Sequence, residues 1–330
     1  MQRTKFTYAE GILEAFNYLL ENYKECFVIG QGLWSPWYVG STMKDLDKNF
    51  GVERIIDTPV SESATTGAAV GAALSGMLPI VVHPRIDFML YAMDSIVNQA
   101  AKWHHMTGGQ ASVPLTIRGI INRGGEQGAQ HSQALHAWFA HIPGLKVVTP
   151  YSATDARDLL IASVLDPNPV IYIDDRWLYD LEASQSSISE KTLDDIRPNI
   201  VNSGTDVTIV ASGFSTHLAL KASEELKKFS ISAEVIDLRV ISPIDPNVIF
   251  DSLLKTKKLF VIDGGWASCG LSAEIIALVA ENKDLLRSLE SIERLTLPFA
   301  PAPTSRVLED IYYIQKEDII NSVRKAMEAI

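Results

Sequence analysis

The stretch IIDTPVSESATTGAAVGAALSGM, residues 55–77, passes from a short apolar run into a run of alanines and glycines. The apolar run is typical of a buried strand, and the small residues that follow it predict a helix near 62–76. A further apolar run, PIVVHP (79–84), comes directly after that helix. A strand, a helix and a strand in immediate succession indicate a βαβ unit with parallel strands.

The same alternation extends over the first half of the chain. Apolar runs rich in Val and Ile are typical of parallel strands that are buried on both faces. A capping-box pattern, Thr7 with Glu10, predicts a first helix that ends near residue 22. We expect further strands at 26–30, 54–59, 113–119, 145–150 and 169–174, and further helices near 89–106, 131–141 and 153–165.

A second alternation of strands and helices follows a polar segment that has no clear periodicity. That segment, residues 186–202, is interpreted as a linker. It separates a first domain at 1–185 from a second domain at 203–330. Both halves therefore predict the same fold class, an α/β fold with two doubly wound domains.

The composition excludes several classes of function. Among the 330 residues, 29 Lys and Arg stand against 40 Asp and Glu, which gives a net charge of −11. This balance argues against a nucleic-acid-binding surface, which needs clustered positive charge. The sequence has two cysteines, no HExxH or CxxC spacing, and no apolar run long enough to cross a membrane. With an N-terminus that lacks a signal-peptide core, these features predict a cytoplasmic protein.

Three residues stand where expected strands give way to loops: Glu62, Phe88 and His131. Ligands of parallel sheets bind outside the carboxyl ends of the strands, so these residues form a candidate site. Each also has a simpler interpretation. Glu62 could simply complement a helix dipole, without a chemical role. Phe88 could pack in the core, and His131 could be a polar residue of a Gly-rich loop whose hydrogen bonds are satisfied. No GxGxxG, GxxxxGK[ST] or GxSxG motif indicates another chemistry.

Several motifs, in the same order along the chain, resemble the β subunits of E1-type 2-oxoacid dehydrogenases. More broadly, they resemble the pyrimidine-binding and C-terminal domains of the transketolase superfamily, and the resemblance covers nearly the whole chain. The motifs are RIIDTPVSE (54–62), AMDSIVNQAAK (92–102), GAQHSQ (128–133), HIPGLKVVTP (141–150), DPNPVIYID (166–174), VIDLRVISPID (235–245) and VIDGGWASCGLSAEI (261–275).

The resemblance implies that the chain binds thiamine diphosphate. It assigns Glu62 the hydrogen bond to N1′ of the aminopyrimidine ring, which favours the tautomer that deprotonates the thiazolium carbon. Phe88 matches the aromatic residue that stacks on this ring, and Val60 belongs to the same cofactor-binding set. His131 matches the histidine that faces the substrate and stabilises negative charge on intermediates.

The resemblance also implies ions and partner subunits. The family's GDG motif, which holds the diphosphate and Mg²⁺, is absent from this sequence. We therefore expect an α-type subunit to complete the site in an α2β2 heterotetramer, and a lipoyl acyltransferase to accept the acyl group. A potassium ion is expected at four positions that hold one in some relatives, although a capped helix end is the simpler interpretation: Leu115, Ser163, Asp166 and Asn168.

Several loops depart from the family pattern, among them GQGLWSPWYVG (30–40) and LPFAPAPTS (297–305). The departures add basic residues near the candidate site, and these are candidate substrate ligands, or else members of salt bridges: His83, Arg85 and Arg123. These departures keep open a second hypothesis, in which the chain is half of a split transketolase-like transferase that moves a two-carbon or acyl unit to a sugar-type acceptor. A third hypothesis is a non-catalytic scaffold. The dehydrogenase subunit is the main prediction.

Overall fold

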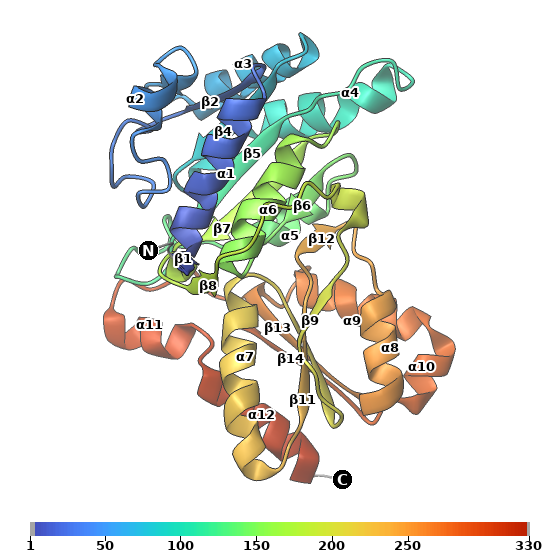
Figure 1. Cartoon of the computed structure of the whole chain (residues 1–330). Coiled ribbons are helices and arrows are strands. Elements are labelled where there is room, and N and C mark those ends of the chain that lie inside the picture. Colours follow the sequence, from blue (N-terminus) through green and yellow to red (C-terminus); the bar gives the residue numbers. More distant parts are fainter. Residues whose placement is uncertain (1–3, 329–330) are drawn as a thin grey trace. The chain divides into compact units, whose positions relative to one another are not determined.

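The computed structural model describes residues 4–328, which form two compact units (Figure 1). The first unit extends to Arg123 and resumes with Trp138–Ile196. The second unit consists of Gly124–Ala137 and continues from Arg197. The segment Gly124–Ala137, which is predicted to lie inside the first domain, is therefore part of the second unit. Among the described residues, no helix is both long and apolar enough to span a membrane.

The first unit is built on a parallel sheet. Its strands are β2 (Cys26–Gly30), β3 (Ile55–Asp57), β4 (Leu78–His83), β5 (Thr116–Ile121), β6 (Lys146–Val148) and β7 (Val170–Asp175). They lie in the order β6-β7-β5-β4-β2-β3, and every pair of neighbours is parallel, as predicted. From β2 the chain moves outward to β3 and then returns to β4 on the other side of β2. The strand order therefore reverses between β2 and β4.

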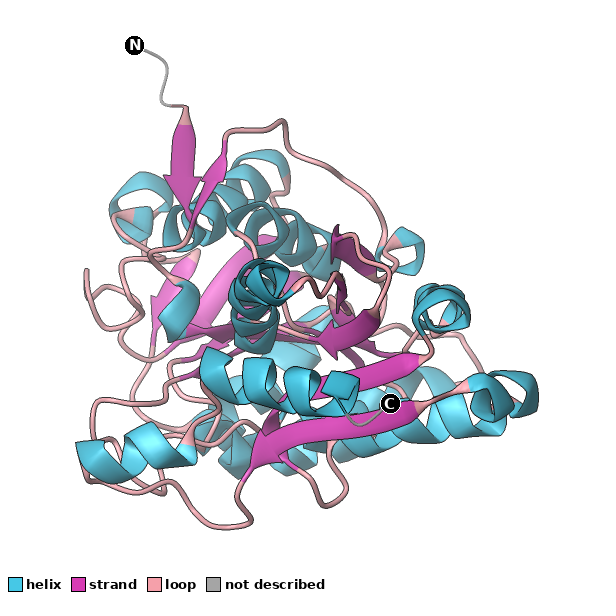
Figure 2. Cartoon of the chain, turned by 90° about the horizontal axis from the view of Figure 1, so that it is seen from below, coloured by secondary structure: helices cyan, strands magenta, loops and turns pink. Residues whose placement is uncertain are grey.

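Helices flank the strands within each unit (Figure 2). Those of the first unit are α1 (Tyr8–Asn22), α2 (Leu46–Phe50), α3 (Glu62–Leu74), η1 (Phe88–Ala92), η2 (Asp94–Ala100), α4 (Ala101–Met106), α6 (Ala153–Val164), η3 (Arg176–Leu178) and η4 (Leu193–Asp195). α1 begins at the predicted capping box, in which Thr7 and Glu10 each accept a hydrogen bond from the other's backbone. α1 packs against α6, and α3 packs against η1 and η2. A small antiparallel ribbon pairs β1 (Lys5–Thr7) with β8 (Glu182–Ser184).

The second unit is built on a mixed sheet. Its strands are β9 (Asn199–Asn202), β10 (Val207–Ala211), β11 (Ala233–Asp237), β13 (Lys258–Trp266) and β14 (Ser291–Leu297), and the short β12 (Val240–Ser242) follows β11 along the chain. The order is β14-β13-β10-β11-β9, with β9 antiparallel to β11 and the other pairs parallel. The prediction of a second α/β domain is confirmed.

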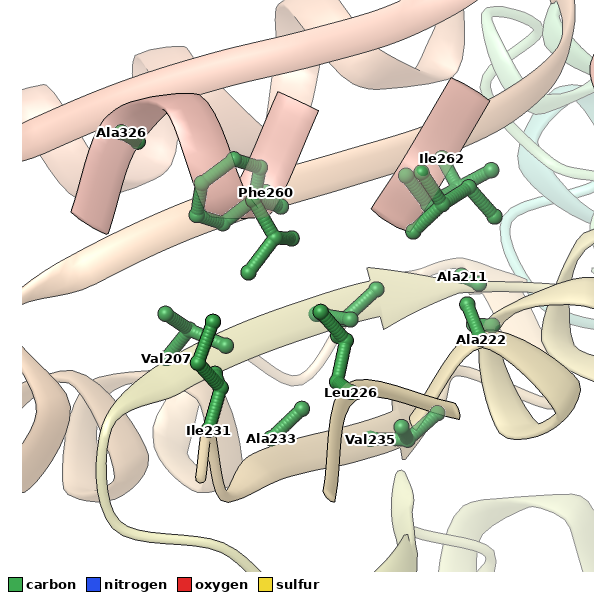
Figure 3. Close-up of a cluster of buried hydrophobic side chains, with 14 residues drawn as sticks. Val207, Ala211, Ala222, Leu226, Ile231, Ala233, Val235, Phe260, Ile262 and Ala326 are labelled. Atoms are coloured by element: carbon green, nitrogen blue, oxygen red, sulfur yellow. The ribbon is translucent and has the colours of Figure 1, made fainter. Parts of the chain in front are cut away.

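Helices cover both sides of this second sheet. They are α7 (Phe214–Leu226), η5 (Lys227–Phe229), α8 (Asn247–Thr256), α9 (Leu271–Glu281), α10 (Lys283–Ser288), α11 (Arg306–Tyr312) and α12 (Lys316–Glu328). In Figure 1, α7 and α12 lie on one side of the strands and α8, α9 and α10 lie on the other. Phe260 of β13 and Leu226 of α7 belong to the buried cluster between strands and helices that is drawn in Figure 3.

Three predicted elements differ most from the structure. The helix expected at 131–141 is shortened to α5 (His136–Ala140), because the glycine-rich segment before it follows an irregular path. The helix expected at 89–106 is divided into η1, η2 and α4, of which η2 is a π-helix. Within the segment 186–202, expected to be a linker, β9 forms the edge of the second sheet.

Candidate active site

A pocket lies at the carboxyl edge of the first sheet, where the strand order reverses. Ligands of open α/β folds bind at such a switch point. The lining residues come from the ends of β2, β3 and β4 and from the first turns of α3; they are Gly30, Gln31, Thr58, Pro59, Ser61, Glu62, Thr65, Val82 and His83. The sequence predicts Glu62 at this edge, but it holds no recognisable signal for the hydroxyl groups around Glu62.

Glu62 is held at this edge by the way in which β2 and β3 end. The Asp57 carboxylate accepts a hydrogen bond from the backbone of Gly32 at 2.6 Å, which fixes the loop after β2 against the end of β3. α3 then begins at Glu62, so the carboxylate lies at the positive end of the helix dipole. The Glu62 side chain is half-buried. A carboxylate placed in this way can accept a hydrogen bond from one edge of a ligand.

His83 lines the same pocket as Glu62. Its side chain is buried, and its Nε2 atom lies 3.2 Å from the hydroxyl oxygen of Thr66 on α3. Burial lowers the pKa of His83 from 6.5 to about 4, so the ring is neutral near pH 7. A neutral histidine offers a hydrogen bond and no positive charge. The predicted role of His83 as a substrate ligand stays a prediction, and the structure favours a polar group over an anion as its target.

The lowered pKa of His83 predicts a loss of stability in acid. The unfolded chain binds a proton at His83 below about pH 6.5, whereas the folded chain does so only near pH 4. The free energy of unfolding should therefore fall through this window as the pH is lowered, by on the order of 3 kcal/mol from His83. We expect His83→Gln to lessen the fall in urea unfolding experiments, and His141→Gln, at an exposed histidine, to leave it unchanged. If the free energy of unfolding fell equally with pH in His83→Gln and in the wild type, a neutral His83 would be contradicted.

Three further predicted residues lie close to these pocket residues along the chain. Val60 lies between β3 and α3, and Arg85 and Phe88 follow β4. Phe88 is half-buried and begins η1, which packs against the helix that Glu62 opens. Val60, directly before α3, is 72% exposed and offers an apolar surface. Burial, followed by the positive charge of Arg176, lowers the pKa of Arg85. These positions are compatible with binding of an aromatic ring by Phe88 and Val60, and their roles stay predictions.

Arg123 is engaged within the first unit. Its guanidinium lies 2.5 Å from the Asp175 carboxylate, and both side chains are almost fully buried. The guanidinium also lies 5.6 Å from the ring centre of Trp177. The salt bridge that is the alternative interpretation of Arg123 is therefore present, and it leaves little free positive charge for a substrate. Among the three predicted basic ligands, Arg123 is the one that the structure favours least.

The four positions predicted to hold potassium already have partners. Lys146 donates a hydrogen bond to the Asp166 carboxylate at 2.6 Å, and the Asn168 backbone donates to its other oxygen at 2.9 Å. The carbonyls of Leu115 and Ser163 accept backbone hydrogen bonds. The ammonium group of Lys146 thus already lies beside Asp166 and does not favour a potassium ion at the same place. Within residues 4–328, no cluster of three His, Cys, Asp or Glu side chains could hold a metal ion.

His131 lies in the second unit, in the loop that precedes α5. Its side chain is half-buried, and its backbone N–H donates a hydrogen bond to the carbonyl of Gly128 at 3.3 Å. Glu62 and Phe88 belong to the first unit. The expectation that His131 acts on the same substrate as Glu62 therefore stays a prediction.

Comparisons with known proteins agree with this architecture. A family model described as "Transketolase, pyrimidine binding domain" matches residues 4–180, and one described as "Transketolase, C-terminal domain" matches residues 197–319. The mitochondrial pyruvate dehydrogenase E1 component subunit beta of Saccharomyces cerevisiae is 37% identical over 324 residues, which cover 97% of this chain and 88% of the relative. The acetoin:2,6-dichlorophenolindophenol oxidoreductase subunit beta of Cupriavidus necator is 41% identical over 277 residues, 84% of this chain and 81% of the relative.

A solved structure shows the same fold. The chain of a "split gene transketolase, inactive beta4 tetramer" superposes with a TM-score of 0.77 at 20% identity, and the match covers 98% of both chains. At this identity the likeness concerns the fold alone. Because both family models and nearly full-length relatives match, the chain belongs to the transketolase family of pyrimidine-binding and C-terminal domain proteins, which includes the pyruvate dehydrogenase E1 β subunits.

Proposed function

We propose that this chain is the β subunit of a thiamine diphosphate-dependent E1 enzyme, which decarboxylates a 2-oxoacid and transfers the acyl group to lipoamide. The observation that carries the proposal is 37% identity to a pyruvate dehydrogenase E1 β subunit over 97% of this chain. The position of Glu62 at the switch point of the first sheet supports it. No observation favours the sugar-transferring or the scaffold alternative, since the likeness to a split transketolase is one of fold.

The residues around Glu62 fit the aminopyrimidine half of thiamine diphosphate, which needs a hydrogen-bond acceptor at one edge and apolar surfaces on its faces. When bound, the cofactor supplies a carbanion that adds to the keto carbon and takes up the electrons released by decarboxylation. In the proposal, Glu62 accepts the hydrogen bond from N1′ and exchanges the proton there. Phe88 and Val60 pack against the ring. His131 donates a hydrogen bond to the negative charge that develops on the substrate oxygen.

The other half of the cofactor needs a partner subunit. The sequence contains no GDG motif, so we propose that an α-type subunit binds the diphosphate and its Mg²⁺. A face of α3 is suited to close contact with another chain, because four of its exposed residues are small: Ala64, Gly67, Ala68 and Gly71. A Cβ atom added at Gly71 would meet no atom within 4 Å. An α2β2 complex that delivers its acyl group to a lipoyl acyltransferase completes the proposal.

Calorimetric titration of thiamine diphosphate with Mg²⁺ tests the split site. We expect no binding to this chain alone and binding to the chain copurified with its α-type partner. The complex should then decarboxylate pyruvate or another 2-oxoacid, with turnover that requires lipoamide or an artificial oxidant. Binding to the single chain would show that the diphosphate site lies here, and the division between two subunits would be wrong. An absence of binding to the complex would contradict the proposed enzyme.

A further inference from the structure

The loop that carries His131 contains several residues in the left-handed backbone region. Gly124, Gly125 and Gly128 have φ angles of 72°, 67° and 73°, and Glu126, with a φ of 61°, lies in the same left-handed region. A residue other than glycine is uncommon there, and such strain persists only where the surroundings over-determine the conformation. The second unit supplies contacts of this kind on both sides of His131.

Helix α11 holds the part of the loop that precedes His131. The Glu309 carboxylate accepts hydrogen bonds from the backbone N–H of Glu126 with both oxygens, at 3.0 and 3.1 Å. In return, the Glu126 carboxylate accepts one from the backbone N–H of Arg306, at the start of α11, at 3.3 Å. Glu309 is only 5% exposed, which strengthens these charge-assisted bonds. Thr304 packs closely against Gly128: a Cβ atom added at Gly128 would lie 2.5 Å from the Thr304 methyl carbon.

A buried hydrogen-bonded pair holds the part of the loop that follows His131. The Nε2 atom of His136 lies 2.9 Å from Oδ1 of Asp263, and the two side chains are 8% and 1% exposed. Asp263 also accepts hydrogen bonds from the backbone N–H groups of Gly265 and Ser272, each at 2.9 Å. Burial alone would raise the pKa of Asp263, but His136 and these two amides hold it below its ordinary value. Glu309 thus forms a first anchor of the loop, before His131, and Asp263 forms a second anchor, after it.

We propose that the second unit positions His131 for catalysis, and that Glu309 and Asp263 are the positioning residues. This inference rests on the proposed function, in which His131 faces the substrate. Displacement of a catalytic group by about 1 Å can lower a rate by about 10²-fold, so a loop with three glycines and the strained Glu126 needs contacts that fix it on both sides of His131. Glu309 and Asp263 belong to the same unit as His131, so their contacts fix its loop within that unit.

Variants of Glu309 in the complex with the α-type subunit test the inference. Glu309→Ala removes both acceptors of the Glu126 amide, whereas Glu309→Gln keeps one. The control, Glu234→Ala, removes another buried carboxylate of the second unit, one that accepts the backbone N–H of Gly204 at 3.2 Å. We expect Glu309→Ala to lower kcat by about tenfold or more while KM and the cofactor Kd change by less than about threefold. Glu309→Gln should recover most of the loss, and Glu234→Ala should leave kcat unchanged.

Two further measurements separate positioning from general damage. In a His131→Ala background, Glu309→Ala should lower kcat by no more than about twofold, because the group that it positions is gone. Asp263→Asn removes the charge of the second anchor. It should likewise lower kcat when His131 is present and have little effect on kcat in the His131→Ala background. Hydrogen exchange in the peptide 124–137 should become faster in Glu309→Ala and not in Glu234→Ala.

The outcomes distinguish this inference from the proposed function. An equal loss of kcat with and without His131, or unchanged exchange in the peptide 124–137, would overturn the positioning role of Glu309. If the wild-type complex did not bind thiamine diphosphate, the proposed function would be wrong. The exchange measurement would then decide by itself whether Glu309 holds the loop.

Discussion

Replacement of Glu62 by glutamine is expected to lower kcat of the assembled enzyme by about 10²- to 10⁴-fold, the range that a general acid–base group supplies. The amide has the shape of the carboxylate, but it cannot take up the proton at N1′ or carry the charge that favours the reactive tautomer. The fold should change little, since Glu62 is half-buried and stabilises the start of α3 as a first-turn charge, by about 0.3–1 kcal/mol. Steady-state turnover at saturating cofactor measures the change in kcat. Urea unfolding measures the change in the stability of the fold.

Glu274→Gln is the matched control for this variant. Glu274 is also an acid in the first turn of a helix, α9, and its side chain is exposed. Both variants lose the interaction with a helix dipole, but only Glu62 lines the pocket. If Glu62→Gln retained turnover within about twofold of the wild type, as a lost dipole interaction alone would allow, Glu62 would be a helix-terminal charge and no more.

The strands of the first sheet could be predicted from the sequence because each contains a short run rich in Val and Ile between helical segments. Small errors have local causes. The expected strand at 113–119 begins only at Thr116, because Pro114 lacks the N–H group that a ladder needs. β9 could not be predicted, since NIVN (199–202) is short and carries polar ends. Its conformation depends on pairing with β11, which lies further along the chain.

The position of Glu62 could be predicted because it depends on local features, the end of one strand and the start of the next helix. The partners of charged side chains depend on the folded chain instead. Arg123 pairs with Asp175 across two neighbouring strand ends, 52 residues apart in the sequence. His136 meets Asp263 at a separation of 127 residues. No pattern within a window of sequence distinguishes such a buried pair from a basic residue that awaits a substrate.

Replacement of His131 by alanine is expected to lower kcat by about 10²- to 10³-fold, as the loss of one donor to a developing negative charge does in other enzymes. The Kd for thiamine diphosphate should stay within about threefold of the wild type, because His131 is proposed to touch the substrate and not the cofactor. Single-turnover kinetics and calorimetry on the complex measure the two quantities separately. His141→Ala, at an exposed histidine that the proposal does not use, is the control.

In His131→Ala, a fall in kcat with an unchanged Kd for thiamine diphosphate would assign His131 to the substrate, because the loop keeps its anchors in this variant. The hydrogen bonds of Glu126 to α11 and of His136 to Asp263 do not involve the His131 side chain. A lost imidazole should therefore remove a hydrogen bond to the substrate without releasing the loop. A parallel fall in rate and in cofactor affinity would instead show that His131 packs within the site. If the rate fell in His131→Ala but not in Glu309→Ala, His131 would remain catalytic, and its position would be set by residues other than Glu309.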